Sequence, residues 1–195
     1  MLLDEDILAS DYIGTQDTVQ DEALARICTR AQSLVEAYLH RTLEAQQYID
    51  EVHDGCGQSW FYLAHKPLIV VTELTINEIS IDITTLKLYP ESGKVDVDFN
   101  ISTGKRNIVI TYWAGYVGDV VPPAIAGLYH PELPKVIEEA MYQVAHRLWL
   151  KSGLSGQARE GLASRGGEGG TTAFLPNLLD PEMIEALQAY REIRL

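Results

Sequence analysis

The hydrophobic periodicity of this chain changes twice, and those changes limit the folds open to it. In residues 18–39 apolar side chains recur every three or four positions, as they do along one side of a helix. Residues 45–116 instead alternate apolar and polar side chains, which is the period of a half-buried strand. Residues 132–151 return to the helical spacing. The sequence therefore predicts an α+β fold in which a β region is inserted between two helices.

The two helical segments carry apolar stripes that predict a shared interface. The stripe of the first helix consists of Leu24, Cys28, Ala31, Val35 and Tyr38. The stripe of the second helix consists of Ile137, Met141, Val144 and Leu148. Because an amphipathic helix of this length gains most of its stability from packing, we expect the two stripes to face each other and form a helical core.

The alternating region predicts an antiparallel meander or a small β sandwich. The expected strands are 46–53, 58–65, 68–77, 80–89, 93–99 and 106–114. Asp54-Gly55-Cys56-Gly57 has the composition of a hairpin turn, and Tyr89-Pro90-Glu91-Ser92-Gly93 that of a second turn. Gly115 follows the last strand and permits a sharp exit from it.

The last forty-odd residues differ from the predicted core, residues 1–152. Residues 153–173 are rich in glycine, which predicts a flexible linker. Residues 174–195 predict a short helix with Asp180 as its N-cap and Pro181 in its first turn. Its apolar residues, proposed as anchors for a partner, are Leu178, Leu179, Met183, Ile184, Leu187 and Tyr190. The alternative is that this helix folds back on its own domain.

Charge narrows the classes of partner. Fifteen basic and twenty-eight acidic residues give a formal net charge of −13. A protein that grips nucleic acid needs clustered Lys and Arg, and the basic residues here are scattered. Tight DNA binding is therefore not expected. No apolar run is long enough for a membrane span, and the first residues lack a secretory signal. Cys28 and Cys56 are expected to be free thiols in a reducing cytoplasm.

A search for catalytic or metal-binding motifs gives only weak candidates. His53 and Cys56 could hold a metal ion, but no second pair stands at zinc-site spacing, and a polar turn explains them as well. Asp96 and Asp98 share one strand face, which is ordinarily a solvated face. No phosphate-binding glycine motif and no nucleophile elbow is recognised. We therefore predict no enzyme, no cofactor and no metal, with a site assembled from distant positions as the alternative.

Several short motifs, in order, resemble the head–tail connector proteins of tailed bacteriophages, also called adaptor or head completion proteins. The helix exit Ala37-Tyr38-Leu39-His40-Arg41-Thr42-Leu43 is similar to one in that family, and an Asp- and Gly-rich turn follows it at residues 53–57. The remaining motifs are Leu63-Ala64-His65-Lys66-Pro67-Leu68, Val71-Thr72-Glu73-Leu74 and Tyr112-Trp113-Ala114-Gly115-Tyr116. The resemblance covers roughly residues 18–150; the C-terminal segment is longer than the family's core.

The resemblance implies a structural protein of the virion neck that is made in the cytoplasm of the host bacterium. It implies a homo-oligomeric ring, typically twelve-fold, between the portal protein and a downstream neck or tail protein. DNA would pass through the ring without being tightly bound, and residues 174–195 would dock on the portal. The alternatives are a tail-completion or neck protein at another level of the same virion, and a cytoplasmic enzyme with a composite site.

Overall fold

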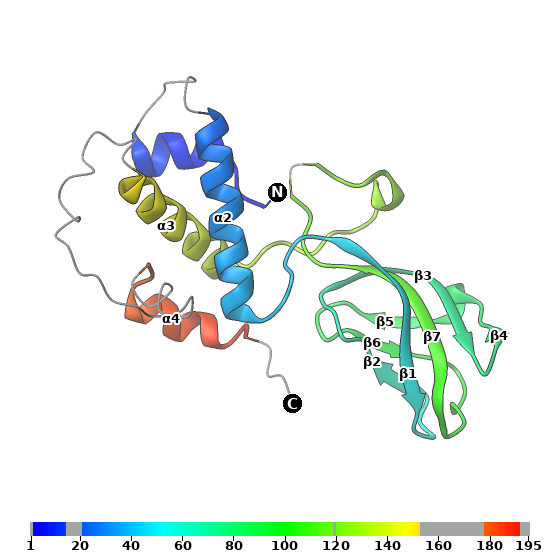
Figure 1. Ribbon diagram of the computed structural model, residues 1–195. Helices are drawn as coiled ribbons and strands as arrows, with labels where there is room; N and C mark the ends of the chain where they lie inside the picture. The colour runs from blue at the N-terminus through cyan, green and yellow to red at the C-terminus, as the bar shows by residue number, and fades with distance from the viewer. Residues whose placement is uncertain (1, 15–20, 119, 153–177, 192–195) are drawn as a thin grey trace. The chain divides into compact units, whose positions relative to one another are not determined.

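The computed structural model of the chain describes residues 2–14, 21–118, 120–152 and 178–191. The chain divides into two compact units (Figure 1), which are taken one at a time below. The first unit comprises residues 1–42 and 133–195, and the second comprises residues 43–132. Helices dominate the first unit and antiparallel strands the second, so the predicted α+β class is confirmed. The predicted linker, 153–173, lies outside the described residues, as do the ends of two predicted helices (18–20, 174–177 and 192–195).

The described residues of the first unit contain four helical segments. They are the N-terminal α1 (Glu5–Ile7) with η1 (Leu8–Ile13), then α2 (Asp21–Leu39), α3 (Lys135–Lys151) and α4 (Pro181–Gln188). Helices α2 and α3 pack against each other, as the two stripes predicted. Among the described residues, no helix has the length and apolar character that a membrane crossing requires.

The buried residues between α2 and α3 match the predicted stripes except near the C-terminal end of each helix. Leu24, Ala31, Val35, Ile137, Met141 and Val144 are buried. Tyr38 and Leu148 are only half-buried, whereas Trp149 is 4% exposed. The buried side of α3 has therefore moved by one position at its last turn, because 3.6 residues per turn make a fixed 3–4 spacing drift around a helix.

The helical segment at residues 5–13 was not predicted. Tyr12 from this segment stacks on Tyr142 of α3, with ring centroids 5.1 Å apart, and donates a hydrogen bond of 2.6 Å to Glu139. The hydroxyl of Tyr142 accepts a hydrogen bond from the backbone N–H of Asp4. Because the segment is too short for a clear helical period, its structure depends on these contacts with α3.

The part of the second unit that the structure describes contains seven strands in two antiparallel sheets. The strands are β1 (Gln46–Gly55), β2 (Trp60–Tyr62), β3 (Leu68–Ile76), β4 (Ile79–Ser80), β5 (Lys87–Tyr89), β6 (Lys94–Asp96) and β7 (Gly104–Ala114). One sheet has the order β1-β7-β3-β4 and the other β2-β6-β5. The 3₁₀ turns η3 (Ile83–Thr85) and η4 (Pro123–Ile125) lie outside the sheets.

The two sheets share one hydrophobic core, so the insert is a small β sandwich. The buried residues of that core are Phe61, Leu63, Leu68, Val71, Leu74, Ile76, Val95, Val97, Ile101, Ile108, Ile110, Tyr112 and Ala114. They come from both sheets, and they alternate with more exposed residues along β6 and β7. The period of two in residues 45–116 therefore reflects strands that turn one face toward this core.

Two details of the predicted strand order are wrong. Residues 54–57 do not close a hairpin, since β1 ends at Gly55 beside Gly104 of β7 and the chain then crosses to β2 in the other sheet. The predicted strand 80–89 is broken. Asp82 accepts a hydrogen bond from the backbone N–H of Thr84 and starts η3, and the chain changes sheets before β5. Short-range composition does not reveal which strand pairs with which.

The Tyr-Trp-Ala-Gly-Tyr motif holds the end of β7 against the first residues of the second unit. Tyr116 donates a backbone hydrogen bond of 2.7 Å to Leu43 and accepts one of 2.8 Å from Ala45, so the start of the second unit is tied to the residues that follow β7. Gly115 between them has φ +119°, and a Cβ there would stand 2.8 Å from backbone atoms of Ala45. Only glycine fits this close approach, which explains the sharp exit that the sequence predicted.

Candidate docking surfaces

The six proposed anchors lie on or beside α4, the short C-terminal helix. Leu178, Leu179 and Leu187 are buried, and Met183, Ile184 and Tyr190 are half-buried. Asp180 is the N-cap and Pro181 opens the helix, as predicted. The apolar side of α4 is thus covered within the first unit, which is the fold-back arrangement that the sequence left open.

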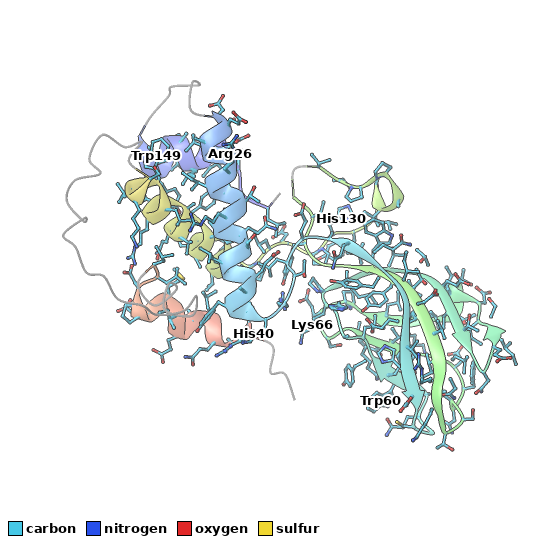
Figure 2. The ribbon with its side chains drawn as sticks, viewed as in Figure 1. Arg26, His40, Trp60, Lys66, His130 and Trp149 are labelled. Atoms are coloured by element: carbon cyan, nitrogen blue, oxygen red, sulfur yellow. The ribbon has the colours of Figure 1, made fainter. Side chains whose placement is uncertain are left out.

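Polar contacts at both ends hold α4 to the neighbouring helices. Asp180 forms an ion pair with Arg147 of α3. At the other end Arg191 donates to the ring nitrogen of His40, which stands just after α2 (Figure 2), and its guanidinium lies 5.4 Å from the ring centroid of Tyr38. Asp180 and Arg191 are exposed and their partners are half-buried, and pairs at the surface each contribute only about 0–1 kcal/mol. The three buried leucines are therefore the main attachment of α4.

A cluster of polar side chains in the second unit surrounds the carboxylate of Glu51. One oxygen of the Glu51 carboxylate accepts from His53 Nε2 at 2.7 Å and from the backbone N–H of Ala64 at 3.0 Å. The other accepts from the hydroxyl of Tyr112 at 2.6 Å and lies 3.9 Å from His65 Nε2. His65 also stacks on Tyr48, with ring centroids 3.7 Å apart.

The electrostatics of this cluster follow from its hydrogen bonds. Burial raises the pKa of Glu51, but the hydrogen bonds from His53, Ala64 and Tyr112 favour the carboxylate more strongly and lower the pKa to about 2. Burial and the neighbouring carboxylate raise the pKa of Tyr112 well above its ordinary value. The ionised Glu51 and the neutral Tyr112 thus fix β1 to the segment that precedes β3. The members are far apart in sequence, so no motif could have revealed the cluster.

The weak metal candidates of the sequence have other surroundings in the structure. His53 faces Glu51, and Cys56 is exposed beside a hollow of about 240 Å³ that both residues help to line. Asp96 pairs with Lys94 at 3.3 Å, while Asp98 is exposed. Within the described ranges, no group of three or more His, Cys, Asp or Glu side chains stands close enough to hold a metal ion.

These observations define a class of protein: a helical unit with an inserted β sandwich, in which the polar clusters have structural explanations. A family model described as head completion protein matches residues 8–145, more than half of the chain. The chain therefore belongs to the head completion protein family, and the resemblance seen in the sequence is confirmed.

Solved structures with the same fold come from gene transfer agent (GTA) particles. A chain from the neck of an empty GTA particle, computed with C6 symmetry, aligns with a TM-score of 0.58 and 13% identity over 99% of this chain and 91% of that one. A chain from the virion of a native GTA particle gives 0.56 and 15%, over 99% and 91%. A third, from a native neck computed with C12 symmetry, gives 0.51 and 12%, over 100% and 94%. No curated protein matches the chain.

Proposed function

We propose that this chain is a structural protein of the neck of a phage-type particle, where copies form a ring adaptor between the portal and the tail or a further neck protein. Membership of the head completion protein family carries this proposal. The likeness of nearly the whole chain to chains from particle necks, one of them computed with twelve-fold symmetry, supports it. The opening of the ring would continue the DNA channel, and the net charge of −13 per copy would discourage DNA from adhering to its wall.

Removing the gene from the producing cell tests this function. The expected result is DNA-filled heads that lack tails or lose their DNA, and electron microscopy of the particles would show it. Supplying the protein in trans should restore tailed particles, and labelled protein should appear at the neck. Normal tailed particles in the absence of the protein would overturn the proposal. Labelled protein at a lower level of the neck or tail would support the tail-completion alternative instead.

Within this function, we propose that α4 transfers from its own unit to the portal. An eight-residue helix has little stability of its own, so it must stay packed on something. In the free chain three buried leucines and weak exposed polar contacts attach it. Burying a leucine side chain contributes about 1.5–3 kcal/mol. An apolar groove on the portal that buries the same leucines would therefore stabilise α4 about as much as its own unit does.

Truncation after Lys151 tests the transfer. The shortened protein should fold with a lower melting temperature, because loss of Leu178, Leu179 and Leu187 uncovers apolar surface on the first unit. It should also fail to join portal-bearing heads. The full-length variant Glu185→Gln, changed at an exposed position of α4, should join heads normally. If the truncated protein joins heads as well as the control does, α4 is not the portal-docking element.

A further inference from the structure

The outer side of the three-stranded sheet carries an unusual concentration of aromatic side chains. The register places Trp60 beside Asp96 and Lys87 in one row, and Tyr62 beside Lys94 and Tyr89 in the next. The residues between them, Phe61, Leu88 and Val95, belong to or pack on the sandwich core, so these six side chains share the opposite face. We call these six residues the aromatic face; Figure 2 marks the position of Trp60.

Contacts within the aromatic face hold it in a fixed arrangement. The ammonium group of Lys94 lies 5.3 Å from the ring centroid of Trp60 and 5.0 Å from that of Tyr89, and 3.3 Å from Asp96. The Trp60 and Tyr62 rings meet edge to face, with centroids 5.3 Å apart. Tyr62 is nevertheless 53% exposed and Tyr89 46% exposed. A preformed face of exposed aromatic side chains loses little entropy when a partner covers it.

A second exposed apolar surface follows β7. Residues 120–131 contain no Asp, Glu, Lys or Arg, in a chain whose net charge is −13. Val120 is 82% exposed and Tyr129 73%, and Val121 and Leu128 are also exposed. Pro122 has φ −56° and ψ 134°, which are polyproline dihedrals of the kind that aromatic-lined grooves bind. We call residues 120–131 the apolar loop; in Figure 1 it contains η4.

We propose that the apolar loop of one copy docks on the aromatic face of the next copy in the ring. Tyr62 and Tyr89 on the aromatic face, and Val120 and Tyr129 on the apolar loop, are exposed and open to a partner. Two different surfaces of one chain that fit each other give a head-to-tail contact, and a head-to-tail contact that closes after a rotation produces a ring. The inference rests on the proposed ring adaptor function and names the contact that would build it.

Charge favours this pairing over others. Two copies that each carry −13 repel, so self-association is least costly where acidic groups are few. The aromatic face has two lysines and one aspartate, and the apolar loop has no formal charge. The rings form the centre of the contact and not the whole of it. Trp and Tyr side chains bury roughly 150–250 Å² each when fully covered, and Tyr62 and Tyr89 keep only about half of their surface free in the subunit, so the neighbouring residues supply the rest of the roughly 800 Å² per partner of a standard interface.

Cross-linking between two single-cysteine variants tests the contact directly. In a background with Cys56 replaced by Ser, and with the buried Cys28 left in place, K87C and V120C are prepared separately and then mixed; Lys87 is an exposed member of the aromatic face, so all three rings are retained. A short bismaleimide should give covalent dimers of K87C with V120C. The matched control replaces V120C by I79C, which sits at a 66% exposed position outside both surfaces. Dimer yield no higher than that of the control would overturn the inference.

Assembly on portal-bearing heads tests the proposed contact between copies independently of the proposed ring adaptor function. Val120→Asp and Tyr62→Ser should each lower ring occupancy by at least about tenfold, as loss of a central interface residue does, while Ile79→Asp should match the wild type. Full rings from V120D would overturn the inference and leave the ring adaptor standing. If the wild type binds heads but forms no ring, the adaptor proposal fails, whereas a specific K87C–V120C cross-link would still establish the contact.

Discussion

Three hydrogen-bond donors converge on one carboxylate at Glu51, and a single substitution can measure what they contribute. Each donor comes from a different part of the second unit: His53 from β1, Ala64 from the segment before β3, and Tyr112 from β7. The side chain of Glu51 is only 16% exposed, so water cannot replace these partners readily. Hydrogen bonds to a charged group of this kind are worth about 1.5–3 kcal/mol.

We expect Glu51→Gln to lower the free energy of unfolding at neutral pH by about 1.5–3 kcal/mol, because the amide keeps the volume but loses the charge. The folded pKa of about 2 lies below the ordinary value of 4.5, so the stability from ionisation is present above 4.5 and is lost as the pH falls towards 2. The variant should therefore approach the wild type at low pH. Urea unfolding at several pH values measures this, with the exposed Glu73→Gln as control.

The helix interface offers a second test with single residues. Leu24 of α2 is 2% exposed, whereas Leu148 of α3 is only half-buried. Leu24→Ala should cost about 2–5 kcal/mol, as buried leucine truncations do, and Leu148→Ala should cost clearly less because a smaller cavity forms. Denaturant unfolding of both variants compares them. Equal losses of unfolding free energy would contradict this expectation, because they would mean that Leu148 contributes to the interface as much as Leu24 does.

At the scale of secondary-structure elements, the turn between β3 and β4 stores strain that a substitution can release. Asn77 and Glu78 form a two-residue connection, with φ values of +51° and +66°. Hairpin turns of this type strongly prefer glycine at the second position. Glu78→Gly should therefore raise the free energy of unfolding, by up to about 1 kcal/mol.

The control for this turn is Glu91→Gly, at an exposed turn position whose φ is not left-handed. There glycine relieves no strain and only widens the unfolded ensemble, so stability should stay the same or fall. Thermal melts of the two variants side by side distinguish the effects. A gain at both positions, or at neither, would contradict the strain argument.

The elements that local patterns predicted are those whose apolar period is long and unbroken. The β insert, its end at Gly115 and the cores of α2 and α3 follow directly from periods of 2 and 3.6. Pairing between distant strands does not, so the sequence missed that β1 joins β7 and that residues 80–89 cross between sheets. The Glu51 cluster was missed for the same reason, since its partners meet only after β1, β3 and β7 are aligned.

At the scale of the whole molecule, acidic charge is the property that bears most on the proposed channel. The chain carries −13 overall, and its basic residues are few and dispersed. Lys105 and Arg106 stand together and line a hollow of about 680 Å³ at one end of the sandwich, but Glu78 shares that hollow. Two adjacent cations can neutralise only a few phosphates, which is too little for a grip on duplex DNA.

The purified protein should therefore bind duplex DNA no more tightly than micromolar at about 0.15 M salt. Each phosphate contact contributes a slope of about −0.9 when the logarithm of affinity is plotted against that of salt concentration, so any weak binding at low salt should show a shallow slope. Fluorescence anisotropy with a labelled duplex measures both quantities. The double variant K105A/R106A should abolish the residual binding, because it removes the cations lining the hollow at the end of the sandwich. Sub-micromolar binding with a slope steeper than about −5, unchanged in that variant, would mean that DNA is gripped by the protein rather than allowed to slide past it.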